Sequence, residues 1–174
     1  MPTPIPELMA IEVVARLREI KTANNYDFTA SQVDRVNRDG STFEYRHLSI
    51  RVDQPGQERI PESDCSGNPP AIAWSQTFEV RCFCRNSNAT EQPDVETVEP
   101  YATSVNDMVA AVYKAITTPV VSPSTWYTIG GRAFDTQFGS VEYFSSDDGE
   151  YHGAMVPIVC MYRVSENNPF ENRA

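Results

Sequence analysis

The side chains best suited to chemistry in this sequence are four cysteines and two histidines, namely Cys65, Cys82, Cys84, Cys160, His47 and His152. Cys82 and Cys84 are two residues apart in a strand-like stretch, so their thiols should share one face. Structural zinc sites use CxxC pairs or clustered histidines, and neither pattern occurs here. We therefore expect no metal site and no cofactor. The thiols should be reduced and at least partly buried, behaving as small hydrophobic groups. Metal ligation or a disulfide between subunits is the alternative.

Other motifs that could support catalysis are also missing. The sequence has no nucleophile elbow, P-loop, HExxH or dinucleotide-binding fingerprint. Gly130-Gly131-Arg132 does not stand between a strand and a helix start, so it reads as a turn rather than a phosphate site. The acidic residues between Glu91 and Glu99 lack the alternation with glycine that a calcium loop needs, and a solvated loop is the simpler interpretation. The sequence therefore favours a non-enzymatic protein.

Composition limits the remaining choices. The 174 residues are 40% hydrophobic and 22% charged, which is typical of one globular domain spanning 1–174. The net charge of −10 argues against a surface that neutralises phosphates, although it would suit a wall past which DNA slides without sticking. No apolar run is long enough to span a membrane. The first six residues lack the features of a signal peptide, so we expect assembly in a cytoplasm.

Periodicity predicts the elements that must position these residues. Apolar residues spaced by three and four indicate amphipathic helices over 5–21 and 101–117. Alternating apolar residues predict strands at about 32–37, 42–53, 73–85, 133–145 and 151–164. Turns at Asp39-Gly40 and at Asp147-Asp148-Gly149 predict two hairpins. Long loops are expected at 54–71 and 86–100, and a polar tail that leaves the subunit body is expected at 165–174.

This order of elements lacks regular βαβ alternation. It predicts an α+β fold with a mostly antiparallel or mixed sheet of four to five strands. The two amphipathic helices should pack on one face of that sheet, because each has a single apolar side that needs cover.

The sequence is also rich in aromatic residues in its last third. Ordinary core and edge packing would explain them, but aromatic residues and arginine are also enriched in subunit contacts. The candidates for a contact with other subunits or partners are Trp126, Tyr127, Tyr162, Arg163, Pro169 and Phe170.

Three stretches together resemble one known family. The first is the helix opening at Ile5-Pro6-Glu7-Leu8, and the second is the strand that follows the proline-rich Pro69-Pro70 and precedes the helix around Met108–Ile116. The third is the last strand, which ends in Tyr162-Arg163 and runs into Asn168-Pro169. In this layout the chain resembles the tail terminator (tail completion) proteins of tailed bacteriophages. It is somewhat longer than they are, with the excess in the 54–71 and 86–100 loops.

The resemblance implies a structural virion protein of the tail and neck. Such proteins form a ring, usually a hexamer, that caps the tail tube and joins it to the head-side connector. DNA passes through the lumen as cargo without specific binding. The alternatives are another phage neck protein, such as a head-closure or connector component built on a small β-barrel, or a small cytosolic enzyme with a closed pocket.

Overall fold

A computed structural model describes residues 3–30, 32–35, 49–67, 70–85, 95–118, 128–147, 149 and 151–172. Its elements are α1 (Ile5–Arg18), η1 (Thr22–Asn24), β1 (Gln32–Arg35), β2 (Ser49–Arg59), η2 (Pro61–Ser63), β3 (Ala71–Arg85), α2 (Val95–Thr117), β4 (Asp135–Phe138), β5 (Glu142–Ser145), β6 (Tyr151–Ser165) and β7 (Asn168–Asn172). The α+β fold expected from the sequence is confirmed.

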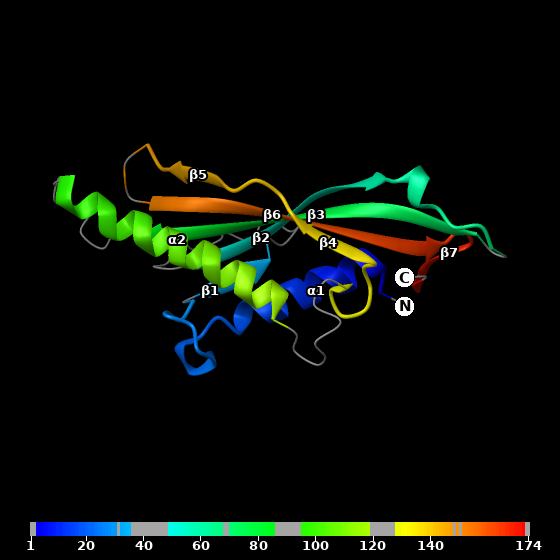
Figure 1. Cartoon of the computed structure of the whole chain (residues 1–174), viewed down its shortest axis with the longest axis horizontal. Coiled ribbons are helices and arrows are strands. Elements are labelled where there is room, and N and C mark those ends of the chain that lie inside the picture. The colour runs from blue at the N-terminus through cyan, green and yellow to red at the C-terminus, as the bar shows by residue number, and fades with distance from the viewer. Residues whose placement is uncertain are drawn as a thin grey trace.

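The sheet is open and mixed. Its strand order is β1-β2-β3-β6-β4, and β5 and β7 also pair with β6. Only β1 and β2 are parallel, and every other pair is antiparallel. The two long central strands, β3 and β6, pair along their whole lengths and run along the long axis of the molecule (Figure 1).

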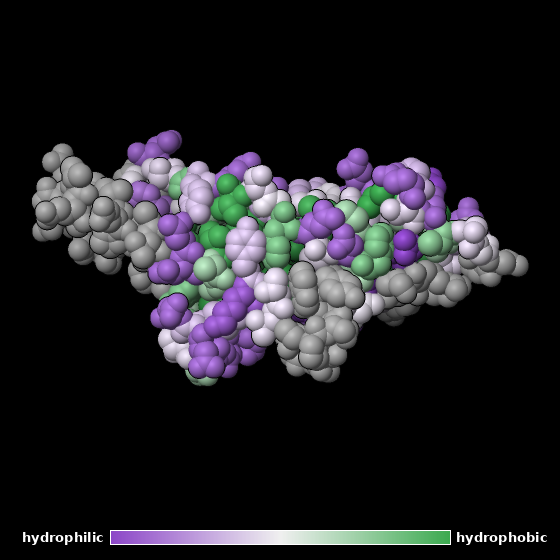
Figure 2. All heavy atoms as spheres, in the orientation of Figure 1, coloured by the Kyte–Doolittle hydropathy of each residue, from purple (hydrophilic) through white to green (hydrophobic). Residues whose placement is uncertain are grey.

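Both helices pack on one face of this sheet. The stripe expected on the strand at 73–85 is confirmed, because Phe78, Val80 and Cys82 are fully buried at alternate positions. The core comes from this face of β3 and β6 and from the inner sides of α1 and α2, as the arrangement in Figure 1 shows. On the side shown in Figure 2, hydrophobic residues form a band along the middle, and hydrophilic residues gather on the segment that contains η1.

Polar side chains join four elements inside this packing. Gln76 of β3 is fully buried, and its Nε2 donates to the carbonyl oxygens of Gly56 and Thr77, both at 2.8 Å. Its Oε1 accepts from Gln54 Nε2 at 2.9 Å. The Oε1 of Gln54 accepts from Arg35 of β1 at 2.7 Å, and Arg35 also pairs with Glu7 of α1. Because buried polar groups are costly unless they are paired, this chain of contacts fixes how α1, β1, β2 and β3 meet.

The first predicted hairpin is wrong. Because β1 and β2 are parallel, the chain between them must cross from one end of the pair to the other, which a two-residue Asp39-Gly40 turn cannot do. The strand predicted at 42–53 begins at Ser49 in the described residues and continues to Arg59, while 42–48 lie outside them. The loop expected at 54–71 therefore begins after Arg59, six residues later than predicted. A bulge between Asp53 and Gly56 accommodates Pro55, which is why the proline does not end the strand.

The strand predicted at 133–145 is two strands, and Pro157 of β6 explains the break. Gly139 N donates to Pro157 O at 2.9 Å, so Pro157 faces this segment with its carbonyl. Because proline has no N–H, it cannot donate a bond back to the ladder. The chain therefore pairs with β6 as β4 up to Phe138 and again as β5 from Glu142. The hairpin expected between this segment and the last strand is confirmed in the pairing of β5 with β6.

The C-terminal segment does not leave the body as a polar tail. A turn at Glu166-Asn167 reverses the chain, and β7 pairs antiparallel with the end of β6. Glu166 N also donates to Pro70 O at 3.0 Å. Asparagine favours such a turn, and an edge strand tolerates Pro169. The predicted tail was wrong because its polar residues suit an edge strand as well as a free end.

The helix ends also differ from expectation. The first helix stops at Arg18 rather than residue 21, because the chain turns there and Ile20 N donates to Leu17 O at 3.1 Å. The second helix begins at Val95 rather than 101, so part of the loop expected at 86–100 is helical, while 86–94 lie outside the described residues. Buried Arg16 joins the helices, because its Nη1 donates to the Ile116 carbonyl in the last turn of α2 at 2.7 Å.

Candidate subunit interface on the uncovered sheet face

The face of the sheet opposite the helices has no helical layer in the described part of the chain. Among the described elements, α1 and α2 contact the sheet from one side, and only η2 reaches the other, near one end of β3. The register places one set of side chains together on that face: Arg51 and Asp53 from β2, Glu79 and Arg81 from β3, and Met155, Pro157, Val159 and Met161 from β6. We call this set the open face.

Its charged half contains a group of ion pairs centred on Asp53. Asp53 Oδ2 lies 2.9 Å from Arg51 Nη2 and 3.3 Å from Arg81 Nε. Arg81 Nη2 lies 2.8 Å from Glu79 Oε2. Two arginines and two carboxylates balance, so this half is neutral in a chain whose net charge is −10.

The other half is an apolar row along β6. Met155, Pro157, Val159 and Met161 are all half-buried, while the alternate residues Val156, Ile158 and Cys160 are fully buried under the helices. A strand that is apolar on both faces is typical of a strand with packing layers on both sides. In the described residues, β6 has a layer on one side only. The row therefore has the composition of a covered surface, and no described element covers it.

Aromatic and cationic groups close the two ends of the open face. At one end, the rings of Phe83 and Phe144 meet edge to face with centroids 5.5 Å apart. Phe144 lies so close over Gly153 that a Cβ there would come within 2.4 Å of the ring. At the other end, Arg163 lies over the Phe134 ring at 4.0 Å, and its Nε donates to Ser63 O at 2.9 Å. These contacts bound the open face, and among the described elements none covers the row on β6.

The structure separates the contact residues predicted from the sequence. Tyr162 is 3% exposed and points to the helix side of β6, whereas Arg163 points to the opposite side and is held by Ser63 and Phe134. Phe170 is 40% exposed on β7, the strand that also contains Pro169. Trp126 and Tyr127 lie outside the described residues. Tyr162 and Arg163 therefore do not form one surface.

Sequence reasoning missed the row on β6 as a surface. Met155, Pro157, Val159 and Met161 were read together with their neighbours as one apolar strand. The signal was present, because a continuous apolar run in an antiparallel strand implies cover on both faces. Arg51, Asp53, Glu79 and Arg81 alternate with apolar residues, a pattern that is also typical of the solvated face of an antiparallel sheet.

The thiols and histidines do not form a reactive centre in the described residues. Cys82, Cys84 and Cys160 are buried free cysteines, and Cys65 is exposed. Burial raises the pKa of Cys82 and of Cys160 to about 12, so both stay protonated near neutral pH. No described group of three or more histidine, cysteine and acidic side chains could hold a metal ion. His152 lies in β6 and His47 lies outside the described residues.

Neither α1 nor α2, the two α-helices of the described residues, has the length and apolar character to cross a membrane. Comparison with known protein families and with curated protein sequences gives no match for this chain.

Proposed function

We propose that this chain is a structural subunit of a bacteriophage tail, a ring-forming tail terminator that caps the tail tube and joins it to the head-side connector. Neighbouring subunits of the ring meet through the open face. The ring belongs to the virion neck and assembles in the host cytoplasm, and DNA passes through its lumen without specific binding.

The observation that carries this proposal is the apolar row on β6, which has no packing layer from the described part of the chain. Met155, Pro157, Val159 and Met161 occupy the centre of the sheet, where a neighbouring subunit would exclude water from them. Apolar surface removed from water stabilises an assembly by about 25 cal/mol per Å². The neutral group around Asp53 gives the same contact a polar part that is already paired within each subunit, so no new charge has to be neutralised on association.

Two further features support a terminator over the alternatives. The open, mixed sheet with two helices on one face differs from the small β-barrel expected of head-closure and connector proteins. The net charge of −10 suits a lumen wall that repels the polyanion it conducts. Because the C-terminal segment is held as β7, we assign contact with the tube or connector to the body and its edges rather than to a free tail.

Native mass spectrometry combined with negative-stain imaging tests the proposal. The purified chain should give a closed ring whose mass is a multiple of the 19.5 kDa subunit, with six copies expected. Val159→Asp should prevent the ring from forming, because it places a charge in the middle of the apolar row. Val159→Thr, which has nearly the same shape and no charge, should retain the ring. A chain that is monomeric at all concentrations would contradict the proposal.

A further inference from the structure

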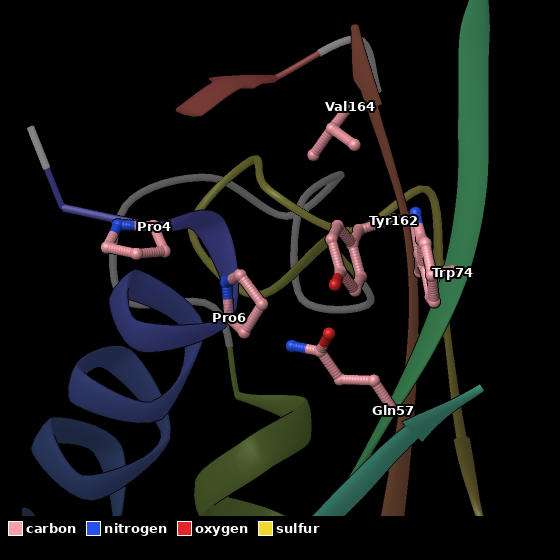
Figure 3. A pocket seen from close by; sticks show the side chains of 6 residues that line it. All are labelled: Pro4, Pro6, Gln57, Trp74, Tyr162 and Val164. Atoms are coloured by element: carbon pink, nitrogen blue, oxygen red, sulfur yellow. The ribbon is translucent and has the colours of Figure 1, made fainter. Parts of the chain in front are cut away.

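The side of α1 that points away from the sheet carries a second apolar stripe. Its residues are Pro4, Leu8, Ile11 and Ala15, and we call it the outer stripe. Ile11 is 54% exposed, and Ala15 is exposed as well. Figure 3 shows Pro6 pointing from the start of α1 toward Tyr162 of the sheet. With about 3.6 residues per turn, Leu8, Ile11 and Ala15 lie on the opposite side of the helix from Pro6.

No described element covers the outer stripe. The helix α1 contacts α2, β1, β2 and β7, and its inner positions Met9, Val13 and Leu17 are fully buried. These contacts leave Ile11 and Ala15 exposed. A surface helix normally carries polar residues on the side away from the core. The helix α1 is therefore apolar on two sides, as β6 is.

The outer stripe and the apolar row on β6 have similar lengths. From Pro4 to Ala15 the helix rises about 17 Å, at about 1.5 Å per residue. From Met155 to Met161 the strand extends about 20 Å, at about 3.3 Å per residue. A helix laid along β6 would therefore cover nearly the whole row.

Carboxylates are the more exposed charged groups beside the outer stripe. Glu7 and Glu12 border it on its two sides, and each is paired with an arginine. The side chain of Glu7 is 40% exposed and that of its partner Arg35 is 27% exposed. The side chain of Glu12 is 27% exposed and that of its partner Arg16 is 4% exposed. The border of the outer stripe therefore presents negative charge.

Arginines are the more exposed charged groups on the open face. The side chains of Arg51 and Arg81 are 25% and 38% exposed, while that of Asp53 is 16% exposed. Glu79, the other partner of Arg81, is 23% exposed. The open face therefore presents positive charge beside its apolar row, which is complementary to the border of the outer stripe.

From these features we propose that the outer stripe of α1 in one subunit packs on the open face of the next subunit, along the apolar row on β6. This inference rests on the ring proposed above and names the partner of its interface. Because the two surfaces differ, the contact is heterologous, and each subunit uses one surface toward each neighbour, which is how a closed ring forms. The sheet of each subunit then has helices on both faces.

Ile11→Asp tests the outer stripe in native mass spectrometry. Because Ile11 is exposed, aspartate should leave the helical circular dichroism signal unchanged, while the ring is lost. The matched control is Ala110→Asp, which places the same charge on an exposed position of α2 and should retain the ring. A ring in the Ile11→Asp variant would overturn the inference and leave the proposed function standing.

Cross-linking identifies the surface that the outer stripe contacts. With Cys65→Ser, the remaining native thiols are buried, so Ile11→Cys and Val159→Cys supply the thiols that a short bismaleimide can reach. The variant with both substitutions should give chains of linked subunits on a denaturing gel. Either substitution alone should give unlinked subunits, because the outer stripe contacts the open face and not a copy of itself.

Two results of the cross-linking would overturn the inference while a ring is still present. One is a linked dimer from Val159→Cys alone, which would show that the open face contacts a copy of itself. The other is the absence of linked subunits in the variant with both cysteines. A parent chain that is monomeric at all concentrations would overturn this inference together with the proposed function.

Discussion

Replacing the buried Gln76 by leucine tests whether the hydrogen-bond network that links α1, β1, β2 and β3 stabilises the sheet. Leucine is close to glutamine in volume, so Gln76→Leu changes hydrogen bonding far more than packing. The substitution removes the donations to Gly56 and Thr77 and the bond accepted from Gln54. The carbonyls of Gly56 and Thr77 and the side-chain amide of Gln54 would then lose these bonds.

The magnitude follows from those contacts. Three hydrogen bonds at about 1 kcal/mol each give a loss of about 3 kcal/mol. The added apolar burial of leucine returns about 1 kcal/mol, on the scale of one buried methylene group. We expect the free energy of unfolding to fall by about 2 kcal/mol, which lowers the urea midpoint by roughly 1 M for a typical dependence on denaturant.

Urea unfolding followed by circular dichroism measures this change at one fixed protein concentration. The control is Gln57→Leu, the same substitution on the same strand pair, where the side chain is exposed and has no hydrogen bond in the described residues. The free energy of unfolding of this control should stay within about 0.5 kcal/mol of the parent value. If the Gln76→Leu variant were as stable as the parent, the hydrogen bonds of Gln76 would contribute nothing to the free energy of unfolding, and the reasoning would be refuted.

Three other predictions follow from the described contacts. Ellman's reagent should react quickly with one thiol of the folded chain, Cys65, and with all four after denaturation, because Cys82, Cys84 and Cys160 are buried; fast reaction of a second thiol would contradict the assigned burial. Gly153→Ala should destabilise the fold by about 1–3 kcal/mol in thermal unfolding, since its Cβ would lie 2.5 Å from the Cys82 carbonyl oxygen, while Gly56→Ala meets nothing within 4 Å and serves as the control. The Ala73 N–H and Arg59 lower the pKa of Asp64 below its ordinary 3.8, so the ionised carboxylate stabilises the fold above pH 3.8 and this stabilisation is lost as the pH falls through the lowered pKa. Asp64→Asn should therefore make the free energy of unfolding less dependent on pH in the acid range. An unchanged acid profile in this variant would contradict the assigned role of Asp64.

Periodicity predicted the parts of the fold that depend on local pattern. The apolar stripes of α1 and α2 and the alternation around Phe78 and Val80 gave the right elements on the right face, because burial of one face repeats with the period of the element. The two helices and the strands predicted at 73–85 and 151–164 were therefore placed correctly, even where the helix ends were not.

The errors come from interactions between distant residues. The parallel pairing of β1 with β2 cannot be inferred from either strand alone. Pro157 interrupts a different strand from its own, so its effect at Gly139 appears only when the two are paired. Asn168-Pro169 suits both a free tail and an edge strand, and only the turn at Glu166-Asn167 decides between them.

The candidate surfaces depend on such pairing even more. One ion pair of this group, between Asp53 of β2 and Arg81 of β3, joins residues 28 positions apart in sequence. Tyr162 was predicted as a contact residue from its type, but the structure buries it on the helix side, where its neighbours Pro6, Gln57 and Trp74 come from three other elements. Residue type alone did not indicate these neighbours.

A cryo-electron microscopy map of the assembled chain tests the central claim most directly. The account predicts a closed ring in which the row formed by Met155, Pro157, Val159 and Met161 is buried against the adjacent subunit. A ring in which this row faces solvent, or a chain that forms no ring, would contradict it.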